Sequence, residues 1–190
     1  MISALYRLCL LLALLSAMPA RADAIEVQSV ELELAEERYL LRADFGFELS
    51  TRLEEALSNG VPLNFLVEFE LKRPRWYWLD ERAAAERMEL RLAYLPLTQQ
   101  YRITGAAHSE SFSTLAEALR SLGRVRGWPV FERKRVDNGE RYTGAVRMRL
   151  DTAQLPKPVQ VSAVTNREWT LASDWRRFAF TPLAPVREAR

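Results

Sequence analysis

The side chains that could support catalysis are few and scattered along the chain. The lone histidine, His108, lies in a loop of small residues close to Ser109, Ser111 and Ser113, and an imidazole can activate a serine hydroxyl. The sequence contains no G-x-S-x-G elbow, however, and a base and a nucleophile this close along the chain seldom face one another. One histidine also cannot build a histidine-rich zinc site. We therefore interpret His108 as an ordinary loop residue.

Two pairs of acidic residues offer a second kind of chemistry. Glu68 and Glu70 are expected about 7 Å apart on one strand face, within the spacing that glycosidase carboxylates use. Because a lysine and an arginine follow directly, we interpret this pair as a solvated strand face. Asp80 and Glu81 could bind a cation through oxygen, but aspartate is also common at turns. We therefore predict no catalytic residue, no metal site and no cofactor, and keep a hydrolase built on Glu68, Glu70 or Asp80 as a remote alternative.

The least ordinary stretch combines cations, a proline and three adjacent aromatic side chains. Its residues are Arg73, Pro74, Arg75, Trp76, Tyr77 and Trp78. An unbroken strand would turn Trp76 and Trp78 to solvent, whereas a bulge at Pro74 would reset the alternation and bury them. We favour the bulge. If the rings are exposed instead, they predict a contact site.

A second, rigid segment completes the candidate contact surface. Leu155, Pro156 and Pro158 belong to an extended corner, because each proline fixes its own φ and restricts the residue before it. We predict that this corner and the aromatic run bind a partner. A flat face would suit a protein, whereas a cleft with nearby polar groups would suit a small ligand such as a glycan stacked on the rings.

Alternation of apolar and charged residues dominates the elements that must position these groups. It predicts strands with one dry and one wet face, which is typical of antiparallel sheets. The expected strands are 30–34, 39–47, 63–71, 87–94, 131–136, 141–150 and 169–175, while 159–164 is ambiguous between strand and short helix. The segment Asp137-Asn138-Gly139-Glu140 predicts a tight hairpin that pairs 131–136 with 141–150.

Two short helices interrupt the strands, and each begins at an expected capping box. Thr51 and Thr114 are each followed three residues later by glutamate, and Gly60 and Gly123 end the helices. Few crossover helices separate the strands, which disfavours a parallel, doubly wound sheet. We therefore predict a mainly β fold: an antiparallel sandwich or strongly curved sheet with two or three short helices at its ends.

The N-terminus has the pattern of a secretory signal. Arg7 precedes an apolar stretch of 11 residues, 8–18, and small-x-small cleavage patterns end at Ala22 and Ala24. Such a stretch is too short to cross a hydrocarbon core of about 30 Å. We predict a signal peptide at 1–22 (or a cut after 24), a single globular domain at 25–181 and a loose tail at 182–190. The mature protein would be soluble and periplasmic, with no membrane anchor.

Charge and cysteine content limit the partners. The chain has 27 basic and 25 acidic residues, and its only cysteine, Cys9, lies in the predicted signal together with Arg7 and Arg21. The mature chain is therefore close to neutral and has no disulfide. A nucleic-acid binder needs a basic surplus on at least one face, so we predict no nucleic-acid partner. Arginine outnumbers lysine 24 to 3, which we interpret as codon bias.

Several blocks of sequence resemble domain-of-unknown-function family 4390. They are 56–63, 75–80, 94–102 and 150–158, followed by Trp169, Leu171, Ser173 and Trp175. The resemblance implies an exported bacterial protein, sometimes labelled a proline-rich signal peptide protein, with no assigned activity and no catalytic residues to carry over. It also implies genes beside a membrane sensor histidine kinase of the nitrogen-regulation type, and hence such a kinase as an envelope partner.

The expected function is therefore a periplasmic, non-enzymatic binding or accessory module that acts on an envelope protein. The alternative is a small-ligand or glycan-binding domain that uses the aromatic run as a stacking platform.

Overall fold

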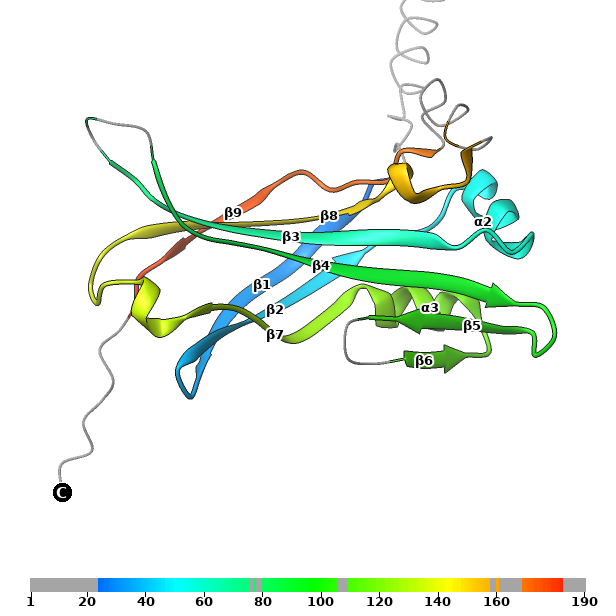
Figure 1. The fold of residues 1–190 in the computed structure, drawn as a ribbon, viewed down its shortest axis with the longest axis horizontal. Coiled ribbons are helices and arrows are strands. Elements are labelled where there is room, and N and C mark those ends of the chain that lie inside the picture. The colour runs from blue at the N-terminus through cyan, green and yellow to red at the C-terminus, as the bar shows by residue number, and fades with distance from the viewer. Residues whose placement is uncertain are drawn as a thin grey trace, which may run out of the picture.

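The computed structural model describes residues 24–75, 77, 80–105, 109–157, 160 and 169–182. Their strands form two antiparallel sheets (Figure 1). The smaller sheet has the order β1-β2-β7: β1 (Glu26–Ala35), β2 (Arg38–Gly46) and β7 (Arg124–Glu132). The larger has the order β6-β5-β4-β3-β8-β9: β3 (Leu63–Arg73), β4 (Glu81–Leu95), β5 (Gln100–Thr104), β6 (Ser109–Phe112), β8 (Tyr142–Leu150) and β9 (Arg176–Phe180). The predicted mainly β, antiparallel fold is confirmed.

The predicted signal peptide, His108 and residues 183–190 of the predicted tail lie outside the described residues. Within the described part of the chain, no helix is long and apolar enough to cross a membrane.

The core lies where the small sheet crosses obliquely over one face of the large one (Figure 1). Alternate residues of β2 and β3 point into it, because successive side chains of a strand face opposite sides of the sheet. Phe131 of β7 joins the two layers: its ring centroid lies 4.8 Å from that of Tyr39 and 5.9 Å from that of Phe69. Aromatic packing therefore holds the two sheets together.

Two helices cover parts of the core that the small sheet leaves open. They are α2 (Thr51–Ser58) and α3 (Leu115–Leu122), and α3 contacts β5 and β6. The predicted cap of α3 is confirmed, since the Thr114 hydroxyl accepts a hydrogen bond from the Glu117 amide. For α2 the predicted cap is wrong by one residue, because the hydroxyl of Ser50, not that of Thr51, accepts from the Leu53 amide.

The predicted Asn-Gly hairpin is wrong. β7 pairs with β2 in one sheet, while β8 lies between β3 and β9 in the other. Between them, the short 3-10 helix η1 (Arg133–Arg135) turns the chain and Val136 is buried. Gly139 does adopt φ 79°, but its amide donates to the Pro182 carbonyl of the C-terminal segment. The turn therefore connects two sheets and does not close a two-stranded hairpin.

The predicted last strand at 169–175 is also wrong. The last strand is β9, and only an isolated bridge joins Ala172 to Arg149. The reason lies at Ser173, whose hydroxyl accepts the Met148 amide and so replaces the backbone carbonyl that a regular ladder would use. Apart from Gln160, the ambiguous segment 159–164 lies outside the described residues.

The bulge expected at Pro74 lies elsewhere. β3 ends at Arg73, and the register shift of the β3–β4 pair falls between Leu71 and Lys72, which leaves Ala83 of β4 as the extra residue. The alternation is therefore reset on the partner strand, before the aromatic run begins.

Candidate functional site

The two arginines of the predicted contact surface tie the end of β3 to its neighbours. Nη1 of Arg73 lies 3.2 Å from the Asp137 carboxylate, and its Nη2 lies 3.2 Å from that of Glu140. Arg75 forms an ion pair with Glu81 at the start of β4. Both guanidinium groups therefore have carboxylate partners in this protein.

The other residues of the predicted surface differ widely in exposure. Tyr77 is 65% exposed and Pro156 is exposed, whereas Leu155 is 2% exposed and belongs to the core, so the predicted contact role of Leu155 is wrong. Trp76, Trp78 and Pro158 lie outside the described residues.

The structure does not bring the two halves of the predicted surface together. Arg73 is at the C-terminal end of β3, while Leu155 follows β8, whose last residue Leu150 pairs with Phe65 near the start of β3. Eight residues of strand separate Phe65 from Arg73, which corresponds to about 26 Å. The aromatic run and the proline corner therefore lie towards opposite ends of the large sheet and cannot form one small contact surface.

A cluster around Glu68 was missed by sequence reasoning. Its side chain is only 6% exposed, although it lies on the outer face of β3. Nε of Arg147 donates to Glu68 Oε2 at 2.6 Å and Nε of Arg149 donates to the same oxygen at 3.1 Å. From the other side, Nε of Arg87 lies 3.3 Å from Oε1. The predicted solvated face is thus wrong for Glu68, because arginines of both neighbouring strands enclose it.

The electrostatics of this cluster keep Glu68 charged. Burial raises the pKa of Glu68, but the hydrogen bonds and charges of Arg147 and Arg149 together outweigh burial and hold the pKa of this carboxyl below its usual value. A carboxylate in this state accepts hydrogen bonds and has no proton to give as a general acid. Glu70 pairs with Lys72 at 2.9 Å instead, so the two carboxylates have separate partners.

The free edges of the two sheets differ in how they are protected. Edge strands expose unpaired backbone groups, which proteins shield by short strands, prolines or irregular backbone. β6 has four residues and β9 has five, while β7 contains Gly127 at φ 64° and Pro129. β1 has no glycine or proline, and no described strand pairs with its outer edge, but its register with β2 shifts between Val27 and Ser29. The seven residues from Ser29 to Ala35 keep a regular register, so among the described strands this part of β1 presents the least protected edge.

The side chains of β1 divide into two rows. Val30 and Leu32 face the core but are only partly buried, and Leu34 is 38% exposed. Glu31 and Glu33 alternate with them on the opposite face, and Glu33 contacts Arg42 of β2 at 2.9 Å. The edge thus offers an apolar row and an acidic row beside its unpaired backbone.

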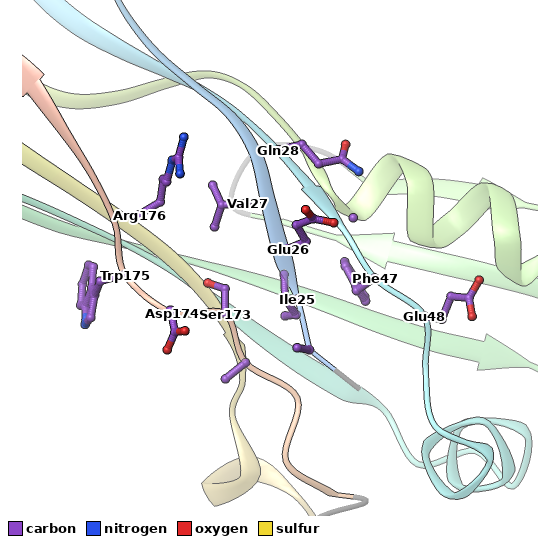
Figure 2. A pocket seen from close by; sticks show the side chains of 13 residues that line it. Ile25, Glu26, Val27, Gln28, Phe47, Glu48, Ser173, Asp174, Trp175 and Arg176 are labelled. Carbon is purple, nitrogen blue, oxygen red and sulfur yellow. The ribbon is translucent and has the colours of Figure 1, made fainter. Parts of the chain in front are cut away.

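A cleft of about 1140 Å³ opens at the start of β1 (Figure 2). It is lined by 24–28, 46–48 and 172–176, and in Figure 2 Trp175 and Arg176 lie on one side of β1 while Phe47 and Glu48 lie on the other. The Ile25 amide donates to the Ala172 carbonyl at 3.3 Å, which fixes the start of the strand. Three carboxylates and one arginine line the cleft: Glu26, Glu48, Asp174 and Arg176. The cleft is therefore acidic and continues the free edge of β1.

A family model described as "Domain of unknown function (DUF4390)" matches residues 22–179. The chain belongs to the DUF4390 family. No curated protein and no solved structure matches it.

A second, more apolar groove of this DUF4390 chain lies between the sheets. It measures about 560 Å³ and is lined in part by Met88 and Leu90 of β4, Ile103 of β5 and Trp128 of β7. The groove exists because three strands cannot cover the inner face of six, so these side chains border an open space. It can accept a small apolar group.

No group of three or more histidine, cysteine, aspartate or glutamate side chains suited to a metal ion occurs among the described residues of this DUF4390 chain. The signal for the β1 edge was present in the sequence: an uninterrupted alternation of glutamate with valine or leucine, free of glycine and proline. Which strand becomes an edge depends on pairing, however, and the pairing of 131–136 with 141–150 that the Asn-Gly turn predicted was wrong.

Proposed function

We propose that this protein is a non-enzymatic binding module of the bacterial periplasm, and that it captures an envelope protein by adding a segment of it to the free edge of β1. The observation that carries the proposal is the free edge of β1, which is regular over the seven residues from Ser29 to Ala35. An extended peptide that pairs with such an edge gains backbone hydrogen bonds, and its alternate side chains provide specificity.

The side chains of β1 define the chemistry of the partner segment. Its inward residues should be apolar, because they would cover Val30, Leu32 and Leu34. Its outward residues should be basic, because they would lie opposite Glu31 and the acidic cleft. Opposite charges on neighbouring strands contribute about 0.2–1 kcal/mol per pair. A second copy of β1 would bring glutamates together, which disfavours self-pairing.

The resemblance to family 4390 guides the choice of partner. It associates such proteins with a membrane sensor histidine kinase, whose extracytoplasmic segment would meet an exported protein in the periplasm. We therefore propose such a kinase as the first partner to test, with an extended segment of alternating basic and apolar residues as the part that binds.

Crosslinking from the edge of β1 tests this function in the cell. A photoreactive residue at Leu34 of β1, which is 38% exposed, should capture the partner. One at Leu97, which is fully exposed in the turn between β4 and β5, should not. The captured segment would be identified by mass spectrometry and made as a peptide. Equal capture of the same proteins from both positions would argue against a site on β1.

Charge reversal then tests the binding chemistry. Glu26→Lys with Glu31→Lys turns two attractions into repulsions, so the peptide should bind on the order of 30-fold more weakly, a loss of about 2 kcal/mol. Glu37→Lys with Glu55→Lys is the matched control, because both side chains are exposed outside β1. The affinities can be measured by calorimetry. Unchanged affinity in the β1 variant would show that the segment binds elsewhere.

The apolar groove between β4, β5 and β7 favours a second candidate function, the binding of a small apolar ligand beside Trp128. Native mass spectrometry of the protein purified from its own periplasm would show such a ligand as an added mass. A Leu90→Arg variant, which places a charge in the groove, should lose that mass. Retention of the mass by this variant would count against the groove.

A further inference from the structure

The register of the large sheet gathers arginines on its outer face. Residues directly opposite in an antiparallel pair share a face, and even-numbered residues of β3 point outward because the odd-numbered ones fill the core. On the side of β4 and β5, four basic residues share this outer face: Arg82, Arg87, Arg91 and Arg102.

The other half of the sheet adds basic residues to the same face. On β3, β8 and β9 these are Lys72, Arg147, Arg149 and Arg177. The acidic residues of the face are Glu68, Glu70 and Glu89. Eight basic residues thus oppose three acidic ones on the outer face of the described strands.

This surplus contrasts with the chain as a whole. Residues 23–190 hold 25 basic and 25 acidic side chains, since Arg7 and Arg21 account for two of the 27 basic residues. The surplus on one face must therefore be balanced by an acidic surplus elsewhere, as on β1 and its cleft. We interpreted the excess of arginine as codon bias, but strand pairing concentrates many of these arginines on one face. The net charge of the whole chain is close to zero and therefore did not indicate this basic face.

Glu68 orients two arginines of this face so that they can bind anions. Arg147 and Arg87 approach Glu68 through Nε, so Glu68 does not use the two terminal nitrogens of either guanidinium. That terminal fork fits the oxygens of a phosphate group. The ring of Trp175 lies 4.5 Å from the Arg147 guanidinium carbon and supports it through a cation–π contact.

We propose that the outer face of the large sheet binds the phosphate headgroups of an anionic lipid bilayer. The charges extend over four strand spacings, from β5 to β9, and over ten residues of β4, from Arg82 to Arg91, an area of about 20 by 30 Å. Single charges spread over such an area match an array of headgroups better than one small anion.

Nucleic acid fits this face less well. Proteins that bind single strands stack bases on several aromatic rings. The outward positions of the described strands β3, β4, β5, β8 and β9 hold none, and the ring of Trp175, just before β9, already contacts the Arg147 guanidinium. β1 belongs to the other sheet, so its edge would stay accessible to a protein partner while the large sheet lies on a membrane.

Vesicle sedimentation tests the proposal with the mature chain. It should bind vesicles made of equal parts of phosphatidylglycerol and phosphatidylcholine, bind pure phosphatidylcholine poorly, and lose binding at high salt, which screens surface charge. Arg91→Gln, Arg102→Gln and Arg177→Gln combined should weaken binding on the order of 100-fold, because each basic residue near an anionic surface contributes about fivefold.

A matched control distinguishes an effect of this face from an effect of the total charge. Arg38→Gln, Arg120→Gln and Arg135→Gln remove the same charge from exposed positions outside the face, and should retain most of the binding. Equal losses in the two variants, or no binding to anionic vesicles, would overturn the proposal. A DNA duplex or an acidic protein bound more tightly than the vesicles through the same three arginines would replace the bilayer as the ligand.

Discussion

Glu68 is a buried charge whose surroundings are charged as well. Three arginines from the two neighbouring strands contact one carboxylate, so removing it would leave their positive charges facing one another. Breaking a buried ion pair by deleting one partner costs about 3–5 kcal/mol. The side chains of Arg147 and Arg149 are about 30% exposed and can turn towards water, which lowers this cost.

We therefore expect Glu68→Gln to lower the free energy of unfolding by about 2 kcal/mol. The equivalent change Glu70→Gln, at a more exposed carboxylate paired with Lys72, should cost less than about 1 kcal/mol. Urea unfolding at neutral pH measures both. Similar losses for the two variants would show that Glu68 has no special structural role.

The pH dependence follows from the lowered pKa of Glu68. A group whose pKa is lower in the folded protein stabilises it above the unfolded pKa, near 4.5, and loses that contribution as the pH falls through the folded pKa. The stability difference between wild type and Glu68→Gln should thus stay constant from neutral pH to about 4.5 and shrink below it. A difference that grows as the medium becomes more acidic would contradict the assigned ionisation.

At the scale of elements, the end of α3 docks directly on the backbone of β2. The Phe45 amide donates to the Gly123 carbonyl at 2.8 Å. Gly123 has φ −72°, so it was not selected for left-handed backbone; a Cβ there would lie 2.2 Å from the Phe45 carbonyl oxygen. Glycine is required at this position by close approach.

Gly123→Ala should therefore destabilise the protein by about 1–3 kcal/mol, because α3 must move away from β2. Gly139→Ala serves as a comparison: its φ of 79° is strained for alanine, but no atom lies within 4 Å of the new Cβ. The backbone strain there should cost about 1–2 kcal/mol. Only Gly123→Ala should displace α3, so amide exchange across 115–123 should become faster in this variant and not in Gly139→Ala. Undisturbed exchange there would argue against the steric explanation.

The sequence predicted elements much better than their partners. Period-two alternation located β2, β3, β4 and β8, and capping located α3, since both signals are local. Asn138-Gly139 predicted a hairpin because nothing local shows that Val136 is buried or that Gly139 bonds to Pro182. The same limit applied to the site. The sequence predicted a solvated Glu68, because the arginines that enclose it belong to two other strands.

At the scale of the whole molecule, Phe131 links the two sheets into one unit. Its ring stacks against Tyr39 within its own sheet and against Phe69 of the other. A cavity there would loosen both layers at once, including the edge strand β9, whose Phe180 ring lies 6.0 Å from that of Phe131.

We expect Phe131→Ala to cost about 3–5 kcal/mol. Hydrogen exchange should show protection falling together in β2 and β3. Leu97→Ala, at a fully exposed side chain, should change the stability by less than about 0.5 kcal/mol. Loss of protection in only one sheet would mean that the two layers unfold independently.

The order of strand pairing also determines when either sheet can be completed. β2 must wait for β7, and β3 lacks its central partner β8 until the chain is available up to Leu150, 85 residues beyond Phe65 in their pairing. Until β7 and β8 have been made, the described strands of a growing chain can therefore pair only with neighbours along the chain, as the hairpin β1–β2 and the consecutive strands β3, β4, β5 and β6. For the export proposed above this order would be useful, because a polypeptide that cannot complete either sheet early stays unfolded enough to be translocated.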